Sequence, residues 1–100
     1  MGSGDSIIVL LTVPRYLPCY FCVYYVYVLQ SDSDANLYIG STSNLKKRLA
    51  DHQVGRVEAT KYRRPLRLVY YEASLSKDKT YNREKYFKTG FGRRFLKNRI

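Results

Sequence analysis

The fold of this chain is decided by the stretch VYYVYVL at residues 23–29, together with the shorter stretch LYIG at residues 37–40. Valine, isoleucine and tyrosine are typical of strands because their bulk suits a pleated, half-buried surface. The residues between the two stretches are serine, aspartate, alanine and asparagine, and most of these side chains can bond to their own backbone in a turn. The pattern predicts a β-hairpin whose loop is longer than the two-residue minimum.

The predicted hairpin is rich in tyrosines. Side chains alternate along a strand, so Tyr25 and Tyr27 share one face of the first strand. Tyr38 and Gly40 share a face of the second strand for the same reason. Because glycine has no side chain, we expect Gly40 to leave room for a ligand to approach the backbone beside a phenol.

Charge is distributed unevenly along the 100 residues, a length that suggests one domain. The net charge is +10, and 17 of the 18 basic residues lie between Lys46 and Arg99. Such a field attracts polyanions, and the interleaved tyrosines and phenylalanines suit stacking on nucleobases. The charge therefore favours nucleic acid as the partner. A solvated basic surface or attraction to anionic lipid is the alternative.

Residues 1–22 are interpreted as an amino-terminal extension of unknown role. The run is apolar from Ile7, but Arg15 and two prolines interrupt it, which argues against a membrane-spanning helix. We expect an appended strand over residues 7–13 or a disordered extension, and no membrane anchor. Cys19 and Cys22 lack the further ligands of a zinc site, so we expect reduced thiols in a reducing, cytoplasmic compartment.

A helix is predicted from residue 45 to residue 53, with Ser43 or Asn44 as its cap. At 100° per residue, Arg48 and His52 share an arc of about 100° with two leucines. The leucines account for a buried stripe, on which a cation and an imidazole are unexpected. One explanation is that Arg48 lies at the edge of the stripe and extends to solvent, while His52 lies at the core boundary with its hydrogen bonds satisfied. The other is that both groups point into one cleft.

The stretch from residue 55 to residue 65 is a basic loop without a clear period, and it is the best candidate for gripping a phosphate backbone. A third strand is predicted to follow it. Leu66, Leu68 and Tyr70 are expected on one face of that strand.

A second helix is predicted with Ser74 or Ser76 as its cap, and it is expected to run to about Thr89, with Gly90 as its stop. Glu84 falls on the same stripe as Phe87. A lone glutamate among lysines is most often a solvated ion pair, and this is the alternative to a functional role. The last residues are predicted to form a basic turn or short helix anchored by Phe91 and Phe95, with Leu96 as a further candidate anchor.

The order of these elements, β-β-α-β-α, predicts a single α+β domain with a three-stranded, mainly antiparallel sheet flanked by helices. Within it, Tyr25-Val26-Tyr27, Tyr38-Ile39-Gly40, Arg48 and Glu84 follow one another in an order that resembles the GIY-YIG nuclease family. The likeness is greatest to small standalone members that resemble the amino-terminal endonuclease domain found in excinuclease ABC. It covers residues 23–100.

This resemblance implies a role for each matching residue. Tyr27 corresponds to a proposed general base, Tyr38 lies beside the scissile phosphate, and Arg48 neutralises that phosphate. His52 relays a proton or orients Tyr27, and the reverse assignment stays open. Glu84 corresponds to the ligand of one divalent metal ion, with Mg²⁺ expected and Mn²⁺ as the alternative. We also expect Arg48 to favour the ionised phenol.

Contacts with nucleic acid are expected from a further set of residues, namely Gly40, Thr60, Lys61, Arg63, Arg64, Arg93 and Arg94. Two positions depart from the family pattern. Tyr25 stands where the first tripeptide has glycine, and Ser41 stands where several members have lysine, which removes one possible phosphate contact.

The expected function is metal-dependent hydrolysis of phosphodiester bonds in DNA, with a structure-specific or repair-related role. A nucleic-acid-binding module that does not cleave, or a basic structural protein, is the alternative. The expected assembly is a monomer or a weak homodimer.

Overall fold

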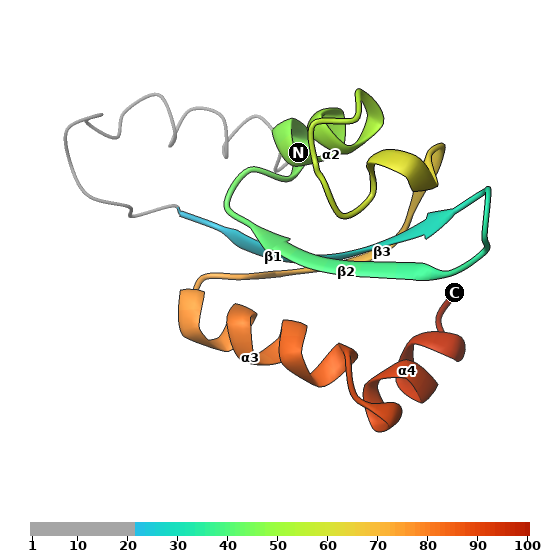
Figure 1. The fold of residues 1–100 in the computed structure, drawn as a ribbon. Coiled ribbons are helices and arrows are strands. Elements are labelled where there is room, and N and C mark those ends of the chain that lie inside the picture. The colour runs from blue at the N-terminus through green and yellow to red at the C-terminus, as the bar shows by residue number, and fades with distance from the viewer. Residues whose placement is uncertain (1–21) are drawn as a thin grey trace, which may run out of the picture.

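The computed structural model describes residues 22–100. Three strands form one antiparallel sheet in the order β2-β1-β3. Their bounds are Tyr24–Ser31 for β1, Leu37–Thr42 for β2 and Leu66–Ser74 for β3. The helices are α2 (Leu45–Gln53), α3 (Lys77–Phe87) and α4 (Gly90–Lys97), with a short 3-10 helix, η1, at Lys61–Arg63. Figure 1 shows α2 on one side of the sheet and α3 and α4 on the other. The predicted α+β fold is therefore confirmed, and the predicted terminal turn or short helix is the helix α4.

The central strand β1 contributes to a core on each face of the sheet because its side chains alternate. Tyr27 and Leu29 pack with Leu66 beneath α2. Val26 and Val28 pack on the opposite face with Ile39, Phe87 and Leu96, beneath α3 and α4. All of these side chains are at most 6% exposed, so β1 is buried from both sides.

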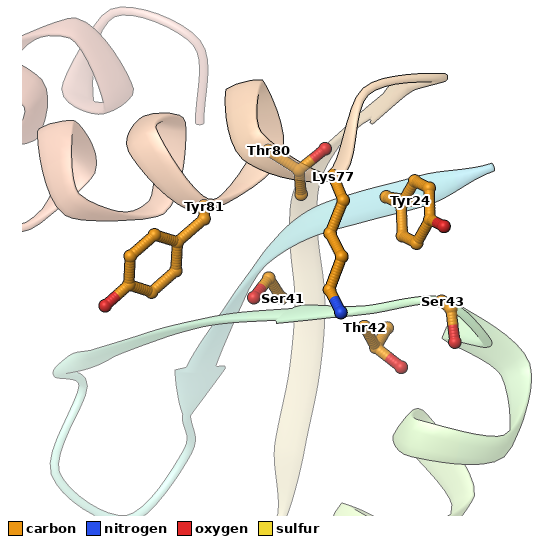
Figure 2. A pocket seen from close by; sticks show the side chains of 7 residues that line it. All are labelled: Tyr24, Ser41, Thr42, Ser43, Lys77, Thr80 and Tyr81. Atoms are coloured by element: carbon orange, nitrogen blue, oxygen red, sulfur yellow. The ribbon is translucent and has the colours of Figure 1, made fainter.

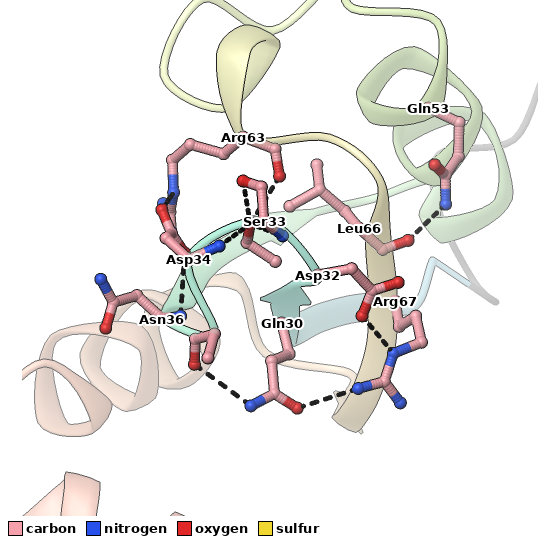
Figure 3. Close-up of polar contacts among 11 residues, drawn as sticks. Gln30, Asp32, Ser33, Asp34, Asn36, Gln53, Arg63, Leu66 and Arg67 are labelled. Carbon is pink, nitrogen blue, oxygen red and sulfur yellow. Dashed lines mark hydrogen bonds and ion pairs between the residues drawn. The ribbon is translucent and has the colours of Figure 1, made fainter.

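The hairpin loop is tied to the segment that precedes β3 (Figure 3). The Ser31 hydroxyl is buried and donates to the Arg63 carbonyl at 2.6 Å. Arg63 in turn forms an ion pair with Asp34 at 2.9 Å, and Arg67 pairs with Asp32 at the same distance. The predicted loop of serine and aspartate residues thus holds the segment before β3 in place.

The strand β3 contains an irregularity that the sequence analysis did not predict. Leu68 lies opposite Leu29 and Tyr70 lies opposite Val28, so Val69 is the extra residue of a β-bulge. A bulge reverses the alternation of the side chains that follow it. Leu66 consequently packs on the α2 side, whereas Tyr70 packs against Phe87 and Phe95 on the other side. The prediction that Leu66, Leu68 and Tyr70 share one face of the strand is therefore wrong.

The carboxy-terminal helices also differ from the expectation. Gly90 does not simply end a helix; it is the first residue of α4, and the Thr89 hydroxyl caps that helix by accepting from the Gly92 amide at 3.2 Å. The side chain of Leu96 is fully buried and Phe95 packs beside it. Phe91 is 70% exposed, so it is not an anchor.

Two expectations concern the amino-terminal part of the chain. The appended strand at residues 7–13 and the thiol of Cys19 lie outside the described residues. Cys22 is disulfide-bonded, so the expectation of a reduced thiol at Cys22 is wrong. Within residues 22–100, no helix has the length and apolar character needed to cross a membrane.

The junction of α3 and α4 allows a paired test of packing. A Cβ atom at Gly92 would lie 2.6 Å from the Phe87 Cα atom and would also overlap the Tyr86 carbonyl oxygen, both of them backbone atoms. We expect Gly92→Ala to lower the free energy of unfolding by roughly 1–3 kcal/mol, as overpacking does. Gly90→Ala is the control, because nothing lies within 4 Å of its added methyl group. Urea denaturation measures both variants, and equal stabilities would contradict this packing.

Candidate active site

A cluster of polar side chains lies between β1 and α2. The Tyr27 hydroxyl is 2.9 Å from His52 Nε2, and Arg48 Nε donates to the same hydroxyl at 3.3 Å. The ring of Tyr38 lies 5.1 Å from the His52 ring and 6.3 Å from the Tyr27 ring, between centroids. The two tyrosines of the hairpin and the arginine and histidine of α2 are therefore brought together.

Gly40 lies next to Tyr27 in the strand register and makes room for its ring. A Cβ atom at Gly40 would lie 2.6 Å from the Tyr27 hydroxyl oxygen. The open space predicted beside this glycine is thus occupied by the phenol itself. Gly40 therefore sets the position of Tyr27 and does not form a ligand cradle.

Helix α2 places His52 deep in this cluster. The side chain of Asn44 starts the helix by accepting from the Lys47 amide, and two turns later His52 reaches the sheet with 1% of its surface exposed. His52 Nδ1 lies 2.8 Å from the Thr60 hydroxyl, which is fully buried. Thr60 was expected to contact nucleic acid; instead it holds the imidazole.

His52 is neutral at neutral pH. Burial, followed by the charge of Arg48, lowers the pKa of His52 from 6.5 to about 4. A neutral imidazole donates from one nitrogen and accepts at the other. If Nδ1 donates to Thr60, the Nε2 lone pair accepts the Tyr27 proton; if Thr60 donates, Nε2–H donates to the Tyr27 oxygen. Only the first arrangement lets His52 act as a proton acceptor for Tyr27.

Burial dominates the ionisation of Tyr27. The pKa of Tyr27 is raised above 10 because the side chain is 1% exposed, although the hydrogen bond from Arg48 lowers it. Arg48 does favour the ionised phenol, as expected, but the effect of burial on the pKa is larger and opposite. Tyr27 therefore carries its proton at neutral pH, and it needs an acceptor such as His52 in order to exchange it.

Arg48 is the cation of the cluster that is free to bind an anion. It is partly buried, and no carboxylate of residues 22–100 forms an ion pair with it. Arg63 and Arg83, by contrast, are paired with Asp34 and Glu72. A guanidinium that is held by a phenol and lacks a carboxylate is suited to bind a phosphate through two of its N–H groups.

Glu84 lies on α3, on the other side of the sheet from Arg48 and His52. Its Oε1 atom accepts from the Ser41 hydroxyl at 2.6 Å, and its Oε2 atom accepts from Lys88 at 2.9 Å. The edge strand β2 connects the two sides, because Gly40 faces Tyr27 whereas the next residue, Ser41, faces Glu84. The negative charge of Glu84 contributes to the raised pKa of Tyr27.

The chemistry of this carboxylate fits a hydrated magnesium ion. Among the described residues, no group of three or more histidine, cysteine, aspartate or glutamate side chains could enclose a metal ion. Mg²⁺ keeps several of its waters and is often bound by one or two carboxylates plus phosphate oxygens. Glu84 would supply the protein ligand. Lys88 now occupies one of its oxygens, which sequence reasoning missed although the i,i+4 spacing to Glu84 indicates it.

The basic loop holds fewer free charges than its composition suggests. Arg63 is paired with Asp34, and Arg64 packs over Gly55 while donating to the carbonyls of Lys61 and Gln53. Lys61 lies over the exposed ring of Tyr62, with 5.2 Å from its nitrogen to the ring centroid. Lys61 is therefore the member of this loop best placed to contact a phosphate.

Two further predicted contacts lie apart from the cluster. Arg93 and Arg94 are exposed on α4, on the side of the sheet opposite α2 (Figure 1). Arg94 lies over the Phe91 ring at 4.9 Å. The structure does not bring these two arginines together with Arg48.

The buried imidazole predicts a pH dependence of stability. In the unfolded chain His52 becomes protonated below pH 6.5, whereas in the folded chain it stays neutral until the pH falls to about 4. The contribution of neutral His52 to the free energy of unfolding is therefore complete above pH 6.5 and is lost as the pH falls to about 4. The total loss is on the order of 3 kcal/mol. Urea denaturation across this range should show a steeper loss for the wild type than for His52→Gln. Parallel curves would contradict the neutral, buried state.

The chain is similar to a known protein family. The family profile described as the GIY-YIG catalytic domain matches residues 23–98. The chain is similar to UPF0213 proteins of Streptococcus pyogenes serotype M5 (strain Manfredo) and serotype M3 (strain SSI-1). Each is 46% identical over 65 residues, which cover 64% of this chain and 70% of the relative. No solved structure is significantly similar to the chain. The chain belongs to the GIY-YIG nuclease family.

Proposed function

We propose that this protein is a metal-dependent endonuclease that hydrolyses phosphodiester bonds in DNA. The observation that carries the proposal is the bonded trio of Tyr27, His52 and Arg48, in which a phenol, a neutral imidazole and an unpaired cation meet. Phosphodiester hydrolysis needs a proton acceptor for water and a cation for the phosphate. Membership of a nuclease family supports the same reaction class.

In the proposed mechanism, Arg48 binds two oxygens of the scissile phosphate. A water molecule reaches the Tyr27 hydroxyl from the side of the partly buried Arg48 and Tyr38. As the water attacks phosphorus, its proton passes to the Tyr27 oxygen while the Tyr27 proton passes to His52 Nε2, which is 2.9 Å away. The bond from phosphorus to the leaving oxygen breaks, the leaving oxygen takes the negative charge, and His52 becomes an imidazolium. This mechanism requires Thr60 to accept from Nδ1–H, which leaves the Nε2 lone pair free to accept the proton. Tyr38 orients the phosphate on the open side.

Glu84 is proposed as the metal ligand. A divalent cation there, Mg²⁺ or Mn²⁺, would stabilise negative charge on the leaving oxygen. The residues of this chain contribute the carboxylate and the Ser41 hydroxyl that orients it.

The proposed substrate is DNA, in keeping with the net charge of +10. A branched or damaged structure, a repair-related role, a cytoplasmic location and action as a monomer or weak homodimer stay predictions. Residues 23–100 are proposed to carry the activity.

A non-cleaving nucleic-acid-binding module is the second candidate. One observation favours it: both oxygens of Glu84 are engaged by protein donors, Ser41 and Lys88. If these contacts persist on DNA, a metal ion has no free ligand.

Cleavage of supercoiled plasmid and branched DNA with Mg²⁺ tests the main proposal. We expect Tyr27→Phe and Glu84→Gln each to lose about 100-fold or more in rate, because general acid–base and metal catalysis each contribute on that scale. Tyr25→Phe and Glu58→Gln are the matched controls, since both lie outside the bonded cluster.

Two results decide between the candidates. Full activity of Glu84→Gln would exclude its role as metal ligand. A wild type that binds DNA but nicks neither substrate with either metal would establish the binding module instead.

Lys88 gives a separate test that needs no cleavage. The ammonium group competes with a metal ion for Glu84, so we expect Lys88→Met to bind Mn²⁺ more tightly than the wild type does, as measured by electron paramagnetic resonance of free Mn²⁺. Lys85→Met removes the same charge nearby, over the Tyr81 ring, and is the control. Unchanged affinity in Lys88→Met would show that the ion pair does not restrict the site.

A further inference from the structure

A pocket beside Glu84 has no assigned role. It lies between the end of β2 and the start of α3, with a volume of about 210 Å³. Figure 2 shows Lys77, Thr80 and Tyr81 of α3 on one side, with Ser41 and Thr42 on β2 opposite them and Ser43 just beyond. Tyr24 of β1 completes the lining. All seven side chains carry a hydroxyl or an ammonium group.

The pocket therefore offers hydrogen-bond donors without a carboxylate in its lining. Some hydroxyls are already used: Thr80 donates to the Ser76 carbonyl, and Thr42 bonds to the backbone of Asn44. The Lys77 ammonium and the Ser43 hydroxyl are free, because within residues 22–100 neither takes part in a hydrogen bond or an ion pair. A free ammonium group and a free hydroxyl in one pocket form a site for an anion.

The pocket shares a wall with the proposed metal site. Ser41 lines the pocket and donates to Glu84 at 2.6 Å, and Thr80 precedes Glu84 by one turn of α3. An anion here would meet some repulsion from Glu84, but Lys88 and Ser41 already offset that charge. A chain of phosphates that passes Glu84 would therefore place a neighbouring phosphate within reach of Lys77.

We propose that this pocket binds a backbone phosphate of the nucleic acid next to the one that is cleaved. Lys77 supplies the charge and Ser43 a hydrogen bond, while Tyr24 and Tyr81 line the pocket on either side. The pocket thereby fixes the register of the strand relative to Glu84 and Arg48. This role rests on the proposed nuclease function for the identity of the ligand, but binding at the pocket does not require cleavage.

The test compares two lysines on one helix. Lys77 lines the pocket, whereas Lys79 lies on another side of α3, near Glu72 and Arg83. Lys77→Ala and Lys79→Ala remove the same net charge. Binding of labelled duplex and branched DNA is measured by fluorescence anisotropy in EDTA at several salt concentrations. We expect Lys77→Ala to weaken binding several-fold and to reduce the slope of log K against log salt by about one, with a smaller effect for Lys79→Ala.

A second measurement locates the phosphate. Once the cut position is mapped, a methylphosphonate that replaces the phosphate beside the cut should weaken binding to the wild type and to Lys79→Ala. It should have no further effect on Lys77→Ala, because the contact is already lost. Ser43→Ala should weaken binding without changing the salt slope.

The outcomes separate this proposal from the nuclease assignment. Equal affinity and equal slope for Lys77→Ala and Lys79→Ala would overturn the phosphate site, even if the wild type cleaves DNA. A selective loss in Lys77→Ala would support the site, even if the wild type never cleaves. A loss in Tyr24→Phe and Tyr81→Phe that exceeds the loss in Lys77→Ala would overturn it as well, since the phenols would then be the main contacts.

Discussion

The structure depends on one buried contact, the hydrogen bond between the Tyr27 hydroxyl and His52 Nε2. Both side chains are 1% exposed, and a polar group buried at that depth is costly unless it is paired. The pairing requires Gly40 to lack a side chain, Thr60 to meet the other imidazole nitrogen, and α2 to present His52 toward the sheet. The core beneath α2 is therefore organised by the groups that we assign to chemistry.

The same contact explains why the cluster is neutral except for Arg48. Burial keeps the pKa of His52 low and the pKa of Tyr27 high, so both are uncharged at neutral pH. A single cation remains, without a carboxylate of residues 22–100 to neutralise it. The site is thus prepared for an anion, whose negative charge would offset both Arg48 and the imidazolium that forms when His52 accepts a proton.

The edge strand β2 joins this cluster to the carboxylate on the other side of the sheet. Gly40 and Ser41 are neighbours that face opposite sides, one beneath Tyr27 and one bonded to Glu84. An edge strand is the place where both faces of a sheet can be reached by one ligand. The donor-lined pocket of Lys77 and Ser43 continues the same edge, which gives a nucleic-acid strand a path along β2.

Much of this could be predicted from the sequence because it is local or periodic. The hairpin, the helix that carries Arg48 and His52 on one face, and the stripe shared by Glu84 and Phe87 follow from strand and helix periods. The tripeptides around Tyr27 and Tyr38, with Arg48 and Glu84, were sufficient to identify the family. The bulge at Val69 and the start of α4 at Gly90 were not predictable, because tertiary packing sets strand register and helix boundaries.

What only the tertiary structure decided is the use of each polar group. Thr60 is eight residues from His52, and Asp34 is far from Arg63 in the chain, yet these contacts assign Thr60 to the imidazole and Arg63 to the hairpin loop. Lys88 and Ser41 hold Glu84, and Gly40 receives a phenol where a ligand was expected. The sequence by itself determined which chemical groups are present and, in the hairpin and in α2, which face each occupies. Their partners depend on distances across the fold, and burial then sets which groups stay charged.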